Sequence, residues 1–157
     1  MKFSALAARY AQTPHKVCVA IPLLIMGILY WLSSIPGTRL PNSPALYGLF
    51  YWMPPALQNI LHVPAFAALA WAWRWALSGW VRSKTAVTLI AIALSVFCGI
   101  FDEWHQSFVP GRYASVVDVI FDIAGVGLGI WLAAWASRYV ANNGAAVAAR
   151  APQARSR

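Results

Sequence analysis

The acidic residues of this protein are confined to one short part of the chain. Among 157 residues the only four are Asp102, Glu103, Asp118 and Asp122. The same stretch, DEWHQSFVPGRYASVVDVIFD, also holds a histidine, a glutamine and an arginine. A carboxylate can act as a general base, a histidine can transfer a proton near neutral pH, and an arginine can hold a phosphate or carboxylate through two parallel hydrogen bonds. The stretch therefore has the residue types needed for acid–base chemistry on an anionic group.

The second half of this stretch predicts a helix with one polar and small-residue face. Asp118 and Asp122 are four residues apart and would share one side of a helix, and Ser115 precedes Asp118 by three. Gly125 and Gly129 continue the same stripe, and small residues allow a second membrane helix to approach closely. We expect the two carboxylates to face a neighbouring helix or a cavity.

The first half predicts the polar end of another helix, followed by a tight turn. Glu103 and Gln106 are three residues apart, and Asp102 and Gln106 are four apart, so their side chains share a face. Pro110 followed by Gly111 then forces a turn. The turn should bring the polar ends of the two helices together.

The candidate functional residues follow from this arrangement. The expected catalytic residues, with carboxylates as bases and histidines as proton carriers, are Glu103, Asp118, His62 and His105. The expected substrate-binding residues, led by the arginine, are Arg112, Gln106, Asp122 and Ser115. A structural alternative is that Arg112 neutralises Asp118 or Glu103 and braces the turn.

A divalent metal is a further possibility that the sequence leaves open. Oxygen ligands suit magnesium or manganese, and the candidate ligands are Asp102, Glu103, Asp118 and Asp122. The chain has neither an HExxH motif nor the G-x-S-x-G motif of a serine nucleophile. The sequence therefore predicts a polar site without defining its reaction.

The elements that position this site are predicted to be membrane helices. The chain is 61% hydrophobic and only 10% charged. In soluble domains the charged share is usually about 25%. Apolar stretches that approach bilayer length are Val17–Leu32, Ile60–Trp80, Thr85–Phe101 and Val116–Ala136. They predict an all-α, polytopic membrane protein with four transmembrane helices. Pro22 and Pro64 are expected in the first turns of their helices, where a missing N–H costs least.

Three regions are predicted along the chain. Residues 1–16 form a basic cytoplasmic N-terminus, residues 17–136 a four-helix membrane domain, and residues 137–157 a flexible basic tail. The first apolar stretch has no convincing A-x-A cleavage site after it, so we interpret it as an uncleaved anchor. Cys18 and Cys98 both lie within apolar runs and are expected to be small packing residues.

The basic residues predict the orientation in the membrane. They concentrate before the first stretch, between the second and third, and after the fourth, whereas the other two connections carry only Arg39 and Arg112. The positive-inside rule then places both termini in the cytoplasm and the polar site at the outer, periplasmic face of the inner membrane. Bases at chain ends and between apolar runs fit lipid headgroups and topology signals, so the net charge of +8 does not indicate a nucleic-acid partner.

The first outer connection is rich in aromatic residues. Tyr47, Phe50, Tyr51, Trp52 and Met53 suggest a short element in the headgroup zone of the membrane. It could serve as an aromatic belt that anchors the fold, or as a lid beside the polar residues.

The sequence DEWHQSFVPGRYASVVDVIFDIAGVGLG resembles the VanZ-like family of small bacterial integral membrane proteins. The residues that carry the family pattern of E-x-x-Q, P-G-R and D before a glycine-rich helix are Glu103, Gln106, Pro110, Gly111, Arg112, Asp118 and Gly125. The LSSIPG segment at residues 32–37 and His62 support the resemblance, which spans roughly residues 17–136. This chain departs from the family in having Gln58 and Asn59 where D-K is common, and Asp122 where asparagine is frequent.

The resemblance implies a four-helix membrane protein whose namesake is associated with resistance to a glycopeptide antibiotic. It implies no settled enzymatic activity, so three hypotheses remain. The protein could be an enzyme that acts on a lipid or lipid-linked envelope substrate. It could be a non-catalytic accessory protein that binds an amphiphilic antibiotic or a wall precursor and alters its access. Proton-linked transport is the third, although four helices are few for alternating access.

Overall fold

The computed structural model describes residues 19–39, 41–42, 44–51 and 54–150, and every regular element within them is a helix. The long helices are α3 (Ala20–Ser33), α5 (Pro55–Leu77), α6 (Lys84–Gln106) and α7 (Val116–Arg150). Two short helices, η1 (Ala45–Tyr47) and α4 (Gly48–Tyr51), lie in the connection between α3 and α5. The prediction of an all-α fold is confirmed for this part of the chain.

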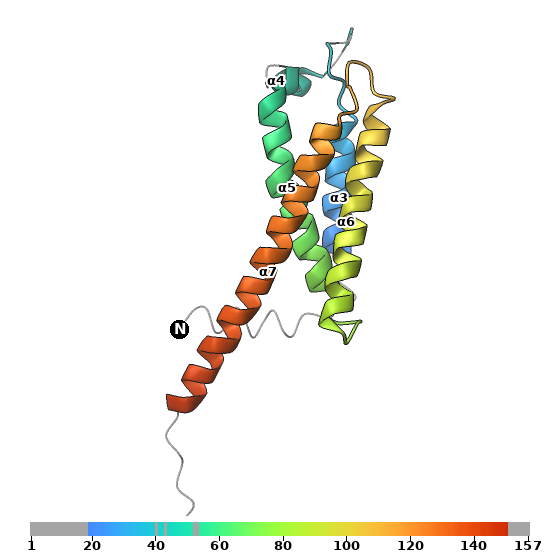
Figure 1. Cartoon of the computed structure of the whole chain (residues 1–157). Helices are drawn as coiled ribbons and strands as arrows, with labels where there is room; N and C mark the ends of the chain where they lie inside the picture. The colour runs from blue at the N-terminus through green and yellow to red at the C-terminus, as the bar shows by residue number, and fades with distance from the viewer. Residues whose placement is uncertain (1–18, 40, 43, 52–53, 151–157) are drawn as a thin grey trace, which may run out of the picture.

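The long helices form a bundle in which successive helices run in opposite directions (Figure 1). α5 packs against each of the other three, and its most extensive contact is with α7. The alternation brings the C-terminal ends of α3 and α6 and the N-terminal ends of α5 and α7 to one end of the bundle. We call this the polar end, because all four acidic residues lie in the α6–α7 region near it.

Three of these helices are long and apolar enough to cross a membrane. They are the segments Leu57–Leu77, Lys84–Gln106 and Val116–Gly144. The chain is therefore a multi-pass helical membrane protein. Helix α3 is apolar but has only 14 residues, a length of about 21 Å against a bilayer core of about 30 Å. A fourth span would need residues before Ala20, and residues 1–18 lie outside the described part, so the fourth span stays a prediction.

Two helix boundaries differ from those that the apolar stretches predict. Helix α5 begins at Pro55, so Pro64 lies in the helix interior and not in the first turn. Proline lacks the N–H that would bond to the carbonyl of Ile60, so α5 has one backbone hydrogen bond fewer there. Helix α7 continues past Ala136 to Arg150, because residues 137–150 contain several alanines and no proline to end it.

The core lies where α5 meets α6 and α7. It is built around Phe66, Leu69, Ala70 and Trp73 of α5, with Ala91 and Cys98 of α6 and Val126 of α7. Cys98 is 8% exposed and is a packing residue, as expected, while Cys18 lies outside the described residues.

The glycine stripe of α7 sets the distance between α7 and α5. A β-carbon at Gly125 would lie 2.5 Å from the carbonyl oxygen of Val63, and one at Gly129 would collide with the carbonyl oxygen of Ala67. Larger residues would therefore hold the two helices apart. The prediction that small residues admit a neighbouring helix is confirmed, and the neighbour is α5.

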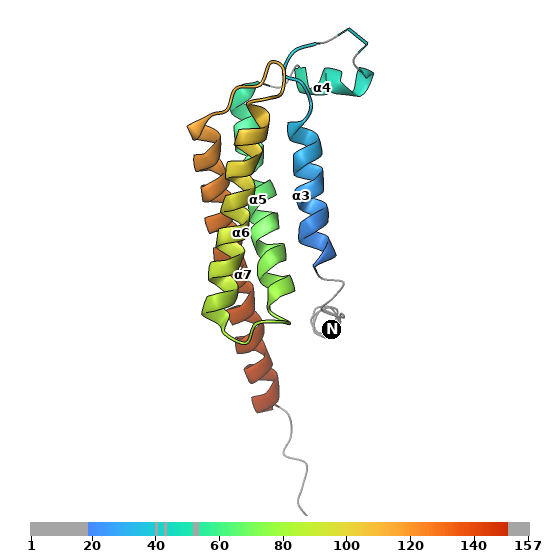
Figure 2. The same cartoon turned by 90° about the vertical axis from the view of Figure 1, so that its right-hand side faces the viewer.

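The aromatic connection forms a short element at the polar end. Helix α4 lies across the direction of the bundle, beyond the end of α3 (Figure 2). The structure thus has a short element at Tyr47 and Tyr51, and its location in the headgroup zone stays a prediction. Trp52 and Met53 lie outside the described residues.

Candidate functional site

A hydrogen bond joins two glycine-containing turns at the polar end. The N–H of Gly37, after α3, donates a hydrogen bond to the carbonyl oxygen of Pro110, 3.0 Å away. Gly111 has a φ of 74°, and glycine adopts such a positive φ readily. A side chain at this position would also crowd Thr38. The contact fixes the segment after α6 against the end of α3 and sets the position of Arg112.

Arg112 bonds to the end of α3 and to α5. Its Nε donates to the carbonyl oxygen of Ile35 at 3.1 Å, and Nη2 lies 3.5 Å from that of Leu32. Nη1 donates to Oε1 of Gln58 at 2.8 Å. Burial is the main cause of a lowered pKa of the Arg112 guanidinium, and the nearby carboxylates of Asp102, Asp118 and Glu103 act in the opposite direction.

The alternative prediction for Arg112 was that it braces the turn by pairing with Asp118 or Glu103. The structure shows the bracing role but different partners. Arg112 does brace the turn, but through backbone carbonyls and an amide, and it forms no salt bridge with Asp118 or Glu103. Carbonyl oxygens at a helix C-terminus lack partners within the helix, so a guanidinium can satisfy them.

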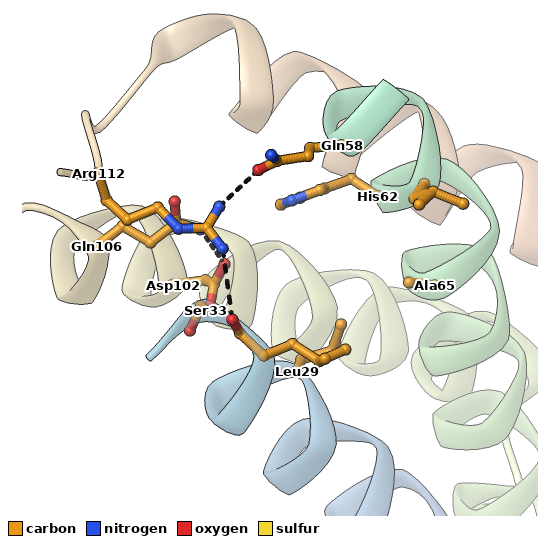
Figure 3. Close-up of a pocket in the computed structure, with 10 residues that line it drawn as sticks. Leu29, Ser33, Gln58, His62, Ala65, Asp102, Gln106 and Arg112 are labelled. Atoms are coloured by element: carbon orange, nitrogen blue, oxygen red, sulfur yellow. Dashed lines mark hydrogen bonds between the residues drawn. The ribbon is translucent and has the colours of Figure 1, made fainter. Parts of the chain in front are cut away.

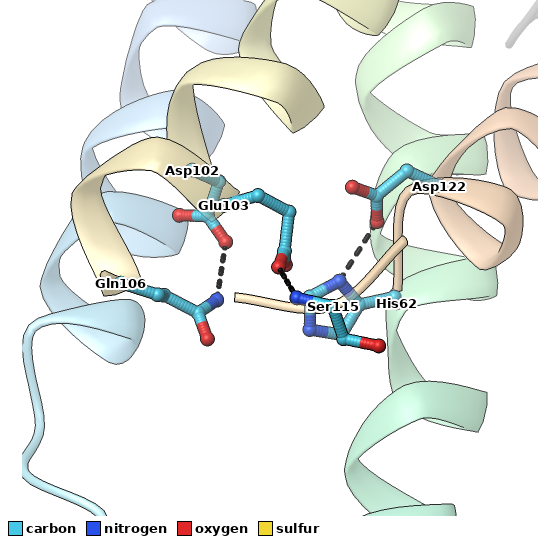
Figure 4. Close-up of polar contacts among 6 residues, drawn as sticks. All are labelled: His62, Asp102, Glu103, Gln106, Ser115 and Asp122. Atoms are coloured by element: carbon cyan, nitrogen blue, oxygen red, sulfur yellow. Dashed lines mark hydrogen bonds and ion pairs between the residues drawn. The ribbon is translucent and has the colours of Figure 1, made fainter. Parts of the chain in front are cut away.

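His62 and Asp122 form the one histidine–carboxylate pair within salt-bridge distance among the residues that the structure describes. Nδ1 of His62, on α5, donates to Oδ1 of Asp122, on α7, across 2.7 Å (Figure 4). Asp122 is 1% exposed, and its other oxygen faces Gly99 of α6, where a β-carbon would lie 2.6 Å away. The ring of His62 also stacks on that of Phe66, with centroids 6.0 Å apart. Contacts with two helices therefore hold the imidazole and its acceptor in place.

The other carboxylates hold the end of α6 and the start of α7. Oδ2 of Asp102 accepts a hydrogen bond from Nε2 of Gln106 at 2.8 Å, and both residues are buried. Oε2 of Glu103 accepts one from the backbone N–H of Ser115 at 2.7 Å. The hydroxyl of Ser115 in turn accepts from the N–H of Val117, so Ser115 caps the start of α7. Figure 4 shows the Asp102 and Glu103 contacts beside the His62–Asp122 pair.

Several carboxylate oxygens remain without a hydrogen-bond partner. Oε1 of Glu103, Oδ1 of Asp118 and Oδ2 of Asp122 are buried and accept no hydrogen bond from any described residue. Within the same residues no three His, Cys, Asp or Glu side chains are grouped to hold a metal ion. The four predicted ligands therefore do not converge on one point in this conformation.

His105 lies apart from the other candidate residues. Its Nε2 is 3.0 Å from Oγ of Ser34, and its ring lies against that of Tyr30, with centroids 4.4 Å apart. It therefore joins α6 to the end of α3 and does not line the pocket described next. Its predicted role as a proton carrier has no geometric support here.

A pocket of about 120 Å³ opens between α3 and α5 at the polar end (Figure 3). Its polar lining consists of Ser33, Gln58, His62, Asp102, Gln106 and Arg112. Its apolar lining consists of Leu29, Leu32, Leu61 and Ala65. His62 lies on the α5 side, and Arg112 lies across the cavity from it. The pocket is thus amphipathic, with polar groups from three helices and a turn and aliphatic side chains from α3 and α5.

The structure adds residues that the sequence prediction did not include. Gln58 is four residues before His62, so the two share a face of α5, and this spacing could have identified it. Ser33 belongs to the LSSIPG segment, to which the sequence assigned no role. The aliphatic lining has no sequence signal, because these leucines resemble any others on an apolar helix.

The fold and the pocket define a class: a multi-pass helical membrane protein with a polar site where the helices end. The family model described as VanZ/LLP1 matches residues 18–137, so the chain belongs to the VanZ/LLP1 family. Searches of curated proteins and of solved structures found no match.

Proposed function

We propose that this protein binds the headgroup of a lipid or a lipid-linked envelope molecule in the pocket between α3 and α5. The observation that carries the proposal is the amphipathic lining of that pocket. Arg112 and His62 lie across the cavity from each other, and Leu29, Leu32 and Leu61 line its apolar part. An amphiphile offers the same combination, with a polar or anionic headgroup joined to an apolar chain.

Arg112 is the group suited to an anionic headgroup. It has five N–H donors, and its contacts with Ile35, Leu32 and Gln58 hold it in a fixed position without a neutralising salt bridge. A fixed guanidinium loses little entropy when it binds a phosphate or carboxylate. Leu61 is 46% exposed, so the apolar part of the pocket adjoins the membrane-facing surface of α5.

The proposed location is the outer face of a bacterial inner membrane. The described cations Arg82, Lys84 and Arg138 lie towards the opposite end of the bundle from the pocket. The positive-inside rule would place that end in the cytoplasm and the pocket at the periplasmic surface. A ligand could then be a membrane lipid, a lipid-linked wall precursor or an amphiphilic antibiotic.

The binding proposal can be tested with the two described histidines as a matched pair. Diethyl pyrocarbonate acylates neutral imidazole, and mass spectrometry reports the modification of each histidine separately. His62 lines the pocket and His105 does not. In nanodiscs of bacterial polar lipids, we expect modification of His62 to be slower than in detergent, while the rate at His105 changes little. Equal slowing at both residues would show general shielding by the bilayer and contradict the proposal.

A second candidate function, chemical conversion of the bound molecule, is favoured by the His62–Asp122 pair. Donation from Nδ1 to Asp122 leaves Nε2 of His62 as the proton acceptor in the neutral ring. Nε2 could then act as a general base towards a hydroxyl or water near the headgroup. The test compares lipid extracts after incubation with wild type or His62→Gln protein. Conversion by wild type alone supports catalysis, whereas unchanged lipids in both samples support the accessory, binding-only function.

A further inference from the structure

Arg74, at the opposite end of the bundle from the pocket, joins three helices without a carboxylate partner. It lies near the end of the apolar segment Leu57–Leu77 and is half-buried. Its Nε donates to Oγ1 of Thr88 on α6 at 3.4 Å, and its Nη1 donates to Oγ of Ser137 on α7 at 3.5 Å. Both distances are longer than usual for such bonds. Because hydroxyl groups carry no charge, the contacts orient the guanidinium without neutralising it.

The hydroxyl groups of Thr88 and Ser137 donate their protons to backbone carbonyl oxygens, so each can only accept a hydrogen bond from Arg74. Oγ1 of Thr88 donates its proton to the carbonyl oxygen of Lys84 at 2.9 Å. Oγ of Ser137 donates to the carbonyl oxygen of Ala133 at 2.7 Å. Each hydroxyl therefore presents lone pairs to the guanidinium. Two of the five N–H groups of Arg74 are used in these contacts.

No side-chain carboxylate of this protein can serve as the counter-ion of Arg74. The chain has four acidic residues. On α7 the acidic residue nearest to Ser137 in the sequence is Asp122, and the two are about 22 Å apart along the helix axis. On α6 the acidic residue nearest to Thr88 in the sequence is Asp102, and the two are about 21 Å apart along the helix axis. Both separations far exceed the length of a salt bridge, in which the charged atoms lie within about 4 Å of each other. A cation near the membrane is stabilised by a nearby negative charge, and no side-chain carboxylate lies close enough to Arg74 to provide it, so the phosphate of a lipid would.

We propose that Arg74, oriented by the hydroxyl groups of Thr88 and Ser137, binds the phosphate of an anionic phospholipid in the leaflet at the α5–α6 connection. A guanidinium matches the geometry of a phosphate through two parallel hydrogen bonds. Lys84 and Arg138, both exposed, lie on the same helices as the two hydroxyl residues, so the surroundings are cationic. This positive surrounding favours a headgroup with a net negative charge over a zwitterionic one. The site is separate from the pocket and does not depend on the function proposed for it.

The test measures which lipid stays bound to the purified full-length protein. The protein is placed in nanodiscs with equal amounts of phosphatidylglycerol and phosphatidylcholine, extracted in mild detergent, and analysed by native mass spectrometry. We expect wild type to retain phosphatidylglycerol preferentially. Arg74→Gln should reduce this preference by more than about five-fold, the factor for the loss of one cation at a membrane surface, because it also removes directed hydrogen bonds to the phosphate.

Arg82→Gln is the matched control, because Arg82 is an exposed arginine in the α5–α6 connection, whereas the arginine that donates to Thr88 and Ser137 is Arg74. We expect it to reduce the preference by no more than about five-fold, the non-specific loss for one surface cation. An equal loss in both variants would show a diffuse charge effect and overturn the proposal, as would equal retention of the two lipids by wild type.

A second variant addresses the possibility that Arg74→Gln does not fold. Thr88→Val with Ser137→Ala keeps the charge of Arg74 but removes the groups that orient it. A reduced preference in this double variant supports a built site. A preference equal to that of wild type would contradict it.

Discussion

At the scale of single residues, the contact between His62 and Asp122 defines the geometry of the polar end. It joins α5 to α7 through a hydrogen bond of 2.7 Å, and Asp122 is almost completely buried. The sequence singles out Asp122 as the residue at which this chain departs from the pattern it resembles. Its spacing from Asp118 predicts that it faces inward, but nothing in the sequence specifies His62 as its partner.

Substitution of Asp122 should separate the hydrogen bond from the negative charge. In Asp122→Ala, Nδ1 of His62 loses its acceptor; because the His62 side chain is 20% exposed, we expect a loss of roughly 0.5–1.5 kcal/mol of the free energy of unfolding, the net contribution of a typical hydrogen bond. Asp122→Asn retains an oxygen that can accept the bond, so we expect a smaller loss. Reversible unfolding in mixed micelles measures both values. Equal stabilities for the two variants would show that the hydrogen bond does not hold α5 to α7.

Arg112 shows why the site could be predicted only in part. The pattern of a cation beside carboxylates predicts a salt bridge, whereas the structure has Arg112 bonded to the carbonyl oxygens of Ile35 and Leu32 and to Gln58. Every residue has a backbone carbonyl oxygen, so the residue type at a position does not predict that its carbonyl will accept a hydrogen bond from Arg112. The orientation of His105 towards Ser34 depends similarly on how α6 is rotated against α3.

At the scale of the helices, sequence periodicity predicted which face of a helix packs against its neighbours when residues of one type recur on that face. The glycine stripe of α7 and the shared face of Asp118 and Asp122 follow from helical spacing, and the structure places this face against α5 and α6. The ends of helices were less predictable. Helix α7 extends to Arg150 because polar, alanine-rich sequence can continue a helix beyond its apolar part.

The glycines of α7 provide a test within one helix. Gly129→Ala would place a β-carbon against the carbonyl oxygen of Ala67, so α7 must move away from α5. Overpacking of this kind costs roughly 1–3 kcal/mol. Gly127→Ala is the control, because no atom lies within 4 Å of the added carbon. Alanine also favours a helix over glycine by about 1 kcal/mol.

Thermal unfolding in detergent compares the two glycine variants. We expect Gly129→Ala to unfold at a lower temperature than wild type and Gly127→Ala at the same or a higher temperature. If Gly129→Ala were as stable as Gly127→Ala, the close contact between α5 and α7 would be wrong.

At the scale of the whole molecule, the charges divide the bundle into two different ends. All four carboxylates lie towards one end, while Arg82, Lys84 and Arg138 lie towards the other. The resulting polarity is a property of the entire sequence and predicts one orientation in the membrane. The pocket and the proposed lipid site at Arg74 would then face opposite leaflets.

Cysteine labelling tests this orientation. In a background with Cys18→Ser and Cys98→Ala, single cysteines replace Ala114 in the α6–α7 connection and Gly79 in the α5–α6 connection, both exposed positions. A maleimide that cannot cross membranes should label the cysteine at 114 in intact spheroplasts, and the one at 79 only after permeabilisation. The reverse pattern would place the pocket in the cytoplasm.

The central claim is that the pocket between α3 and α5 holds an amphiphile. Ala65→Phe would fill its apolar part without altering a polar group, because Ala65 is one of the lining residues of α5. Ala68→Phe adds the same ring at an exposed position on the same helix. The most direct measurement is native mass spectrometry of lipids that co-purify with wild type and the two variants. We predict that a lipid or lipid-linked species bound to wild type and Ala68→Phe is lost from Ala65→Phe; the same bound species in all three proteins would contradict the claim.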